Sequence, residues 1–283
     1  MIEIRNLTFG YGKTKLFSGL NLSLTPGDIY GLLGKNSAGK TTLFKLIAGL
    51  RFPQGGECRV LGYVTAQRPQ PFLADLFYLP EEFKLPRVTV HRYHSMFAPF
   101  YQRFDSDRFF AIVKEFGLDI HQKLYKLSYG QRKKFLIAFG LATGCRLMLL
   151  DEPTNGLDIP SKSLFRKLLA AFAPEDGAVI IATHQARELE KLIDPVVIID
   201  SGRVVFHDTL WNVSQRLTIK LQSREPEPEE ACYWEKVPGG YAVMVESDDV
   251  EDASMDLELL FKAVIDKKSE IARILGGRER RQA

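Results

Sequence analysis

Residues 31–50, "GLLGKNSAGKTTLFKLIAGL", place glycines and a lysine between an apolar run and a segment with the pattern of a helix. Gly34, Gly39, Lys40 and Thr41 satisfy the spacing G-x-x-x-x-G-K-[ST], which has meaning after a buried strand and at the start of a helix. Both conditions hold here. The stretch therefore predicts a strand, a phosphate-binding loop and a helix within an α/β fold.

The glycines of this loop give it the means to bind an anion. Without Cβ atoms, the backbone can wrap so that successive N–H groups point inward, and the helix adds unpaired donors and its positive dipole end. Lys40 would bring a positive charge to the β- and γ-phosphates of a nucleotide, and Thr41 would bring a hydroxyl to Mg²⁺. The alternative is a glycine-rich turn without a ligand. The predicted nucleotide-binding residues of the loop are Gly34, Lys35, Asn36, Ser37, Ala38, Gly39, Lys40, Thr41 and Thr42.

A second motif, "LMLLDEPTNGLD" at residues 147–158, begins as an apolar strand and ends in two carboxylates. Asp151 would lie at the same sheet edge as the glycine loop, where it can hold the metal through water. Glu152 leaves the strand axis and is the candidate general base for the water that attacks the γ-phosphate. An acidic pair that merely caps a strand end is the alternative interpretation.

The pattern of apolar runs predicts two kinds of sheet. Residues 1–9 and 20–24 alternate with period two, as in an antiparallel sheet with one wet face. Four further runs are continuously apolar, as in strands buried on both faces of a parallel sheet: "IYGLLG", "LMLLDEP", "AVIIATH" and "VVIID". Aromatic residues at loosely helical spacing over residues 89–117 predict a compact helical insert with its own small core.

Composition excludes several classes of protein. The excess of Lys and Arg over Asp and Glu, 38 to 35, is too small to predict nucleic-acid binding. Cys58, Cys145 and Cys232 have no metal-ligand spacing and fit buried reduced thiols, which favours a cytoplasmic location. The amino-terminal residues do not have the pattern of a secretory signal, and no apolar run approaches the roughly 20 residues of a spanning helix.

The carboxy-terminal part changes in composition after residue 203. "QSREPEPEEA" cannot sustain a regular element, and it is flanked by two short strand-like runs, "LTIKL" and "GYAVMVE". Residues 256–275 then predict one amphipathic helix that stops at Gly276 and Gly277, and the tail after it is expected to be a solvated end. The apolar stripe of that helix consists of Leu257, Leu260, Phe261, Val264 and Ile265.

A third motif, "KLSYGQRKKFLIAFGLA" at residues 126–142, places Ser128 and Gly130 just before an apolar-periodic segment. A helix N-terminus of this kind can receive an anion, although the chain's own site needs no second cradle. With this motif the chain resembles the cytosolic ATPase subunits of ATP-binding cassette (ABC) transporters, in the family's order from about residue 2 to 207. "GKNSAGKT" is similar to their Walker A loop, "LSYGQ" to their signature, "LMLLDEP" to their Walker B strand, "NGLD" to their D-loop and "ATH" to their switch histidine segment.

The resemblance implies that two cassettes dimerise head to tail, so that Ser128, Gly130 and Gln131 of one chain close over the ATP of the other. It further implies a role for three side chains that spacing alone does not assign. Tyr11 would stack on the adenine, Asp158 would link the two sites, and His184 would contact the γ-phosphate and hold the attacking water. A surface tyrosine and a packed histidine are the alternatives for the first and last.

Three residues depart from the family pattern. Ser37 replaces a glycine of the phosphate loop, and we expect it to fit the turn with a negative φ. Tyr129 replaces the first glycine of the signature pair. Glu81 stands where the family commonly has glutamine; as an oxygen ligand it can approach Mg²⁺, yet it adds negative charge near the γ-phosphate.

We therefore predict a P-loop NTPase domain with a mainly parallel core sheet, an antiparallel β subdomain and a helical insert (about residues 82–140), followed by a small α+β extension. The ATP-binding domain would span residues 1–214, and the extension, of unknown role, residues 215–283. The predicted function is a Mg²⁺-dependent ATPase that powers export through a separate transmembrane subunit. The cassette would pair with a second copy or a paralogue at the inner face of the cell membrane, bound to that transmembrane subunit. An importer cassette, a soluble mechanical ATPase and a plain phosphotransferase are the rival interpretations.

Overall fold

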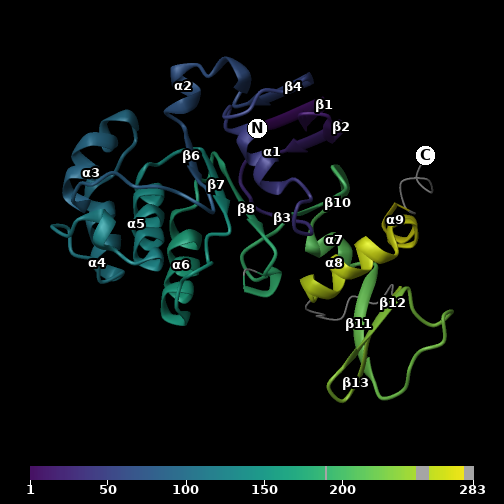
Figure 1. The fold of residues 1–283 in the computed structure, drawn as a ribbon. Coiled ribbons are helices and arrows are strands. Elements are labelled where there is room, and N and C mark those ends of the chain that lie inside the picture. The colour runs from purple at the N-terminus through teal and green to yellow at the C-terminus, as the bar shows by residue number, and fades with distance from the viewer. Residues whose placement is uncertain (189, 247–254, 277–283) are drawn as a thin grey trace.

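The computed structural model describes residues 1–188, 190–246 and 255–276. Its centre is a six-stranded sheet in which five strands run parallel and the last, at one edge, is antiparallel (Figure 1). This confirms the predicted parallel core. In spatial order the strands are β10 (Arg203–Asp208), β9 (Val196–Asp200), β3 (Ile29–Leu33), β8 (Ala178–Thr183), β7 (Leu147–Asp151) and β6 (Leu76–Leu79).

The continuously apolar core strands are explained by apolar layers on both faces of this sheet. On β3, Tyr30 and Leu32 pack in one cluster with helix α1 (Lys40–Ile47) and the antiparallel sheet, whereas Leu33 belongs to the cluster on the opposite face. Since successive side chains of a strand point to opposite faces, a strand covered on both sides needs no polar alternation.

The predicted antiparallel sheet is formed by the strands near the amino terminus and packs above the core sheet (Figure 1). Ile2 and Ile4 are buried whereas Glu3 and Arg5 are exposed, as expected for a sheet with one wet face. Its order is β2 (Thr14–Leu24), β1 (Ile2–Tyr11), β4 (Gly55–Val60) and β5 (Tyr63–Val64).

The helical insert is present but does not have a core of its own. Phe109 and Phe135 are buried in an apolar cluster that continues into the core sheet, where the ring of Phe139 lies 6.5 Å from that of Phe77 on β6. Of the predicted aromatics only Phe100 is strongly exposed, so packing accounts for most of them. The helices of this region are α3 (Val90–Phe97), α4 (Ser106–Glu115) and α5 (Tyr129–Ala142); α2 (Gln70–Leu73) precedes them and α6 (Ile159–Phe172) follows.

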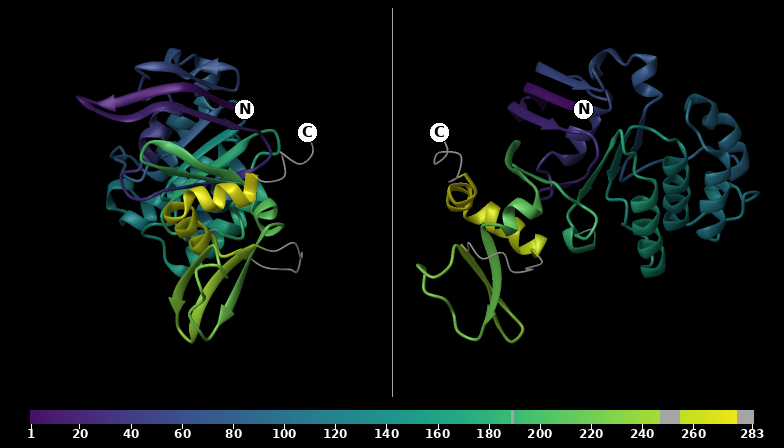
Figure 2. Two further views of the ribbon diagram at one scale, coloured as in Figure 1. Left: turned by 90° about the vertical axis from the view of Figure 1, so that its right-hand side faces the viewer. Right: turned by 180° about the vertical axis from the view of Figure 1, so that it is seen from behind.

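The carboxy-terminal extension lies at the opposite end of the molecule from the helical insert (Figure 2). It contains an antiparallel sheet of β11 (Leu217–Gln222), β13 (Gly240–Glu246) and β12 (Tyr233–Val237), in that order. The two predicted strand-like runs are confirmed as β11 and β13, and β12 was missed. The short helix α7 (Leu210–Ser214) leads into this sheet, and the proposed boundary at residue 214 stays a prediction.

The single helix expected over residues 256–275 is in fact two, α8 (Leu257–Asp266) and α9 (Lys268–Gly276). The chain turns at Lys267, where φ is −124° and ψ is 39°. Residues 266–269 are all exposed, so no buried side chain holds this stretch in one helix. Gly277 and the predicted solvated tail lie outside the described residues.

Helix α8 is attached to the loop that follows β8. Arg187 forms ion pairs with Asp256 (3.4 Å) and Glu258 (2.9 Å), and the Leu257 N–H donates to a Glu190 carboxylate oxygen (3.0 Å). The same apolar cluster that fills the insert extends to Leu260 of this helix. The extension therefore shares the interior of the nucleotide-binding part.

The three cysteines are free and buried, as expected. Burial raises the pKa of the Cys58 thiol to about 11. Among the residues that the structure describes, no helix combines the length and apolar character needed to cross a bilayer.

Candidate functional site

The phosphate-loop glycines are required by close contacts. A Cβ on Gly34 would lie 2.6 Å from the Ile199 carbonyl oxygen, and Gly39, with φ of 108°, would bring one to 2.7 Å from the Phe17 ring. Gly39 is also the N-cap of α1 and provides no side-chain cap. The first N–H groups of this helix therefore stay available to an anion.

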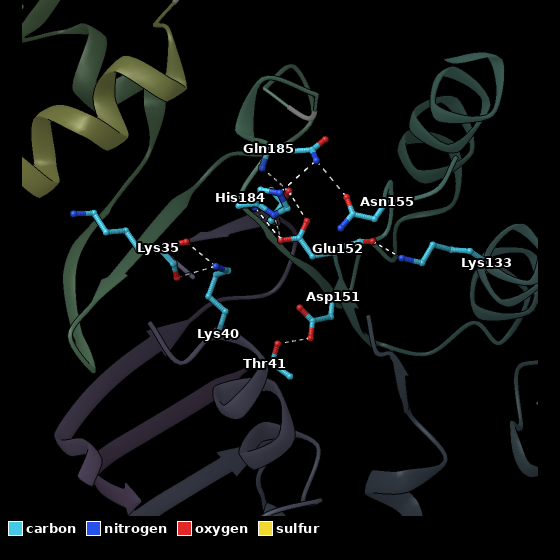
Figure 3. Close-up of polar contacts among 11 residues, drawn as sticks. Lys35, Lys40, Thr41, Lys133, Asp151, Glu152, Asn155, His184 and Gln185 are labelled. Atoms are coloured by element: carbon cyan, nitrogen blue, oxygen red, sulfur yellow. Dashed lines mark hydrogen bonds and ion pairs between the residues drawn. The ribbon is translucent and has the colours of Figure 1, made fainter. Parts of the chain in front are cut away.

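Lys40 is hydrogen-bonded to the main chain of the phosphate loop. Its ammonium donates to the carbonyl oxygens of Gly34 (2.6 Å) and Lys35 (3.3 Å), as Figure 3 shows for the second contact. Burial lowers the pKa of Lys40, an effect that the nearby carboxylates of Glu152 and Asp151 oppose. The loop is thus held in a closed turn around a positive charge.

Ser37 contradicts one expectation. Its φ is 66°, in the left-handed region, whereas the sequence argument required a negative value. The turn keeps the backbone conformation that a glycine would adopt, because the flanking strand and helix fix the path of the loop. Ser37 therefore carries a backbone strain that glycine would avoid.

Thr41 and Asp151 meet as predicted, although they are 110 residues apart. The Thr41 hydroxyl donates to Asp151 Oδ2 (2.8 Å), which joins the start of α1 to the end of β7 (Figure 3). Burial raises the pKa of Asp151, the Thr41 hydrogen bond lowers it, and Glu81 and Glu152 raise it further. A hydroxyl and a carboxylate at this edge form an oxygen donor set that suits Mg²⁺ together with phosphate oxygens.

Glu152 is buried and bonded through both carboxylate oxygens. Thr183 Oγ1 donates to Oε2 (3.1 Å), and the His184 N–H donates to Oε1 (3.0 Å). His184 Nδ1 lies 2.6 Å from the same Oε1. This contact orients the imidazole ring and leaves Nε2 on the side away from Glu152. Glu152 itself has φ of 47°, which lifts it off the strand axis as predicted.

Sequence reasoning missed the two residues behind His184. The Gln185 side-chain amide lies 3.4 Å from His184 Nε2 and donates to Asn155 Oδ1 (3.4 Å). Figure 3 shows these contacts above Glu152. Asn155 lies within the motif of residues 147–158, and Gln185 directly follows His184; these positions are the signal that could have found them.

The phosphate loop, the two carboxylates at the end of β7 and His184 border a cavity of about 580 Å³. Tyr11 is at its rim, where its hydroxyl lies 3.2 Å from Thr42 Oγ1, its ring packs on Phe9, and Arg51 lies over it. Glu81 enters from the segment after β6. Predicted site residues that line the cavity are Tyr11, Asn36, Ser37, Ala38, Gly39, Lys40, Thr41, Thr42, Glu81, Asp151, Glu152 and His184.

Comparison with known proteins identifies the family. The ABC transporter family model matches residues 17–155. The chain is 30% identical over 240 residues to the uncharacterized ABC transporter ATP-binding protein YdbJ of Bacillus subtilis (strain 168), covering 83% of this chain and 77% of that one. This chain belongs to the ABC transporter family. It is an ATP-binding subunit and its activity is the hydrolysis of ATP.

Two further proteins bear on the cassette. The Nod factor export ATP-binding protein I of Burkholderia orbicola (strain AU 1054) is 30% identical over 210 residues, with 72% of this chain and 69% of that one covered. The ATP-binding cassette MJ0796, in a dimeric post-hydrolysis structure with ADP and phosphate, superimposes with a TM-score of 0.65 at 23% identity; 74% of this chain and 99% of that one are covered. The latter likeness shows the fold.

The signature residues of the cassette lie outside its own cavity. Ser128 Oγ accepts from the Gln131 N–H (3.2 Å) while Gln131 Oε1 accepts from the Ser128 N–H (2.9 Å), so the two form a capping box at the start of α5. A Cβ on Gly130 would lie 2.4 Å from the Gly156 carbonyl oxygen. Asp158 caps α6 through the Ser161 N–H (2.9 Å).

Proposed function

We propose that this cassette binds Mg²⁺-ATP between its own phosphate loop and the signature of a second cassette in a head-to-tail pair. The observation that carries the proposal is the separation of the two halves: Ser128, Gly130 and Gln131 do not line the cavity that Lys40 and Thr41 line. A helix N-terminus with a serine cap and no ligand on its own chain is suited to a phosphate held by a partner.

The oxygen donors of this cavity suit a Mg²⁺ ion that is held partly by the protein and partly by the nucleotide. Among the described residues, no group of three or more His, Cys, Asp and Glu side chains is arranged to hold a metal alone. Mg²⁺ usually binds one or two carboxylates and completes its shell with phosphate oxygens and water. Thr41 and Asp151 would hold it, with Glu81 beside them, and the ion would neutralise phosphate charge.

The remaining residues orient and activate water. Lys40 binds the terminal phosphates, and Tyr11 stacks on the adenine. Glu152 accepts the proton of the attacking water, since it is buried at the sheet edge and its two oxygens are held in place by Thr183 and His184. His184, held by Glu152 through Nδ1, directs Nε2 away from that carboxylate and toward the γ-phosphate. Asp158 lies near the signature and links the two sites.

The energy of the reaction would serve a transmembrane subunit. The helical insert exposes Phe100, and the side chain of Met96 beside it is also exposed. This patch is our candidate docking site for that subunit, at the inner face of the cell membrane. We assign export on the strength of the related Nod factor export protein, and the substrate is left open.

The first test replaces Glu152 with glutamine, which keeps the size of the side chain and removes the base. We expect ATP hydrolysis to slow at least about 100-fold while ATP still binds. Glu175→Gln, an exposed change of the same kind away from the cavity, is the matched control and should keep its rate. Turnover in Glu152→Gln close to the wild-type rate would remove Glu152 from this role.

The second test distinguishes a nucleotide site formed by two chains from a site that is complete within one chain. Ser128→Asp keeps a good N-cap but directs a carboxylate at the expected phosphate, so it should abolish hydrolysis without unfolding α5. In a head-to-tail mixture of Ser128→Asp with Glu152→Gln, a mixed pair has one composite site with neither defect. Activity that reappears on mixing the two inactive proteins supports the shared site, and mixtures as inactive as their components argue against it.

A further inference from the structure

Two side chains on the first turns of α5 bond to the main chain of residues that line the chain's own nucleotide cavity. Tyr129 and Lys133 are four residues apart, so they lie on one face of the helix. The Tyr129 hydroxyl donates to the Glu81 carbonyl oxygen (2.8 Å), and the Lys133 ammonium donates to the Glu152 carbonyl oxygen (2.6 Å). The ammonium also lies 5.2 Å from the centre of the Tyr129 ring.

Lys133 is fully buried, with no exposed side-chain area. Burial lowers its pKa to about 8, while Glu81, Glu152 and Asp151 act to raise it. At neutral pH it is therefore still mainly protonated, and its bond to Glu152 is charge-assisted. A buried cation is expensive, and an apolar side chain of similar volume would often serve the fold as well. Its position calls for a role beyond packing.

The carbonyl that Lys133 binds belongs to a residue with an unusual backbone. Glu152 has φ of 47°, and among the described residues its peptide oxygen otherwise accepts a long bond from the Asn155 N–H (3.3 Å). A left-handed glutamate persists only when its surroundings hold it. Figure 3 shows Lys133 approaching this carbonyl from the side opposite His184, so the two contacts hold Glu152 from its main chain and its side chain.

Tyr129 is partly exposed, but two neighbours hold its ring. Its ring stacks on Phe83 (5.7 Å between centroids, 18° between planes), and a Cβ on Gly156 would lie 2.7 Å from it. The side chain that replaces a family glycine is thus wedged between the Glu81 segment and the D-loop.

We propose that Tyr129 and Lys133 form a positioning pair that ties the signature helix to the main chain of Glu81, which is beside the proposed Mg²⁺ ligands, and of Glu152, the proposed base in the same chain. The inference rests on the proposed function of Glu152. A shift of α5, when its N-terminus closes on the partner's nucleotide, is passed through this pair to the main chain of the base. Closure of a chain's signature on the partner's nucleotide therefore improves the alignment of that chain's own Glu152.

The test uses Lys133→Met and Tyr129→Phe in the full chain. Loss of one charge-assisted hydrogen bond should lower kcat about 10- to 100-fold in Lys133→Met, and loss of one neutral bond about 2- to 10-fold in Tyr129→Phe. KM for ATP and the affinity for a fluorescent ATP analogue should stay within about threefold of wild type, because neither side chain contacts the phosphate loop. Unchanged kcat in both variants would overturn the proposal.

A control variant separates positioning from support of the fold. Leu136→Ala truncates a buried apolar side chain on the same helix, so it should lower the melting temperature while the folded protein keeps the wild-type kcat. If Leu136→Ala slows hydrolysis as strongly as Lys133→Met, the effect belongs to helix stability and the proposal fails. If Lys133→Met does not fold, the kcat of Tyr129→Phe still tests the proposal.

The double variant shows whether Lys133 acts through Glu152. Adding Lys133→Met to Glu152→Gln should cause less than a threefold further loss, because the carboxylate it positions is already gone. If the losses of the two single variants instead multiply in the double variant's rate of hydrolysis, Lys133 acts independently of Glu152 and the inference is wrong. If Glu152→Gln alone is fully active, the proposed function fails first; if it is inactive and Lys133→Met is fully active, only the positioning pair fails.

Discussion

Replacing Ser37 with glycine should stabilise the nucleotide-free protein, although the change removes atoms from the centre of the phosphate loop. Ser37 is exposed, and its φ of 66° lies in the left-handed region. That conformation costs an L-residue about 1–2 kcal/mol, and glycine escapes the cost. Glycine loses about 0.5–1 kcal/mol more backbone entropy on folding, so the difference spans about 0–1.5 kcal/mol and the expected gain is near its middle, about 0.5–1 kcal/mol.

Asn36 supplies a matched control one residue earlier. It is also exposed, but it is not among the residues with positive φ, so Asn36→Gly brings the entropic cost without the relief. We expect a loss of about 0.5–1 kcal/mol. The two glycine variants, which change the same loop by similar amounts, should therefore move in opposite directions.

The assay is thermal unfolding without nucleotide, followed by circular dichroism. For a chain of this size a gain of about 0.5–1 kcal/mol raises the melting temperature by about 1–4 °C. Equal destabilisation by Ser37→Gly and Asn36→Gly would refute the reasoning, because it would show that Ser37 pays no conformational cost in the folded loop.

Three further predictions concern other parts of the molecule. Tyr11→Ala should weaken ATP binding about 5- to 100-fold through lost stacking, whereas Tyr11→Phe should bind nearly as well; equilibrium binding of a fluorescent nucleotide measures both. Burial acts to raise the pKa of Asp75, but hydrogen bonds from Arg146 and the charge of Arg103 lower it overall. That carboxylate therefore stabilises the fold above its ordinary pKa, so Asp75→Asn should cost about 1–3 kcal/mol at pH 7, and urea titrations should show the difference vanishing as the pH falls below about 4. Deleting residues 215–283 uncovers the apolar side chains of Phe206 and Val213, so the shortened chain should melt lower and aggregate in light scattering; a soluble product with wild-type melting would show that the extension is an independent unit.

The features of this protein that the sequence predicts are those that depend on short, local patterns of residues. Gly34, Gly39, Lys40 and Asp151 follow from short motifs, because a phosphate cradle and a strand-end carboxylate need fixed residue types at fixed spacing. The parallel strands follow from their continuous apolar runs. Thr41 and Asp151 meet because of the order of strands in the sheet. The sequence predicts this contact only through the rule that the carboxyl ends of parallel strands lie at one edge of the sheet.

The rest depends on contacts between distant segments. No local pattern distinguishes Lys133 from Lys134, which forms an ion pair with Asp158, since the full burial of Lys133 is set by the approach of the Glu152 main chain to α5. The φ of Ser37 follows from the loop path imposed by its neighbours and could not be inferred from its identity. The break at Lys267 is similar, since the apolar spacing continues across it and only the exposure of the polar turn decides where the chain bends.

The attachment of α8 behind β8 limits how cassettes of this type can be recombined. Arg187 lies three residues after His184, and its ion-pair partners Asp256 and Glu258 come from the far end of the chain. A hybrid joined at residue 214 would take Arg187 from one protein and the residues at positions 256 and 258 from another. The mismatched contact would lie close to His184, which faces the γ-phosphate in our proposal. Exchange of residues 185–283 as one block would carry both halves together, so tails of this kind are best swapped with the loop that they hold.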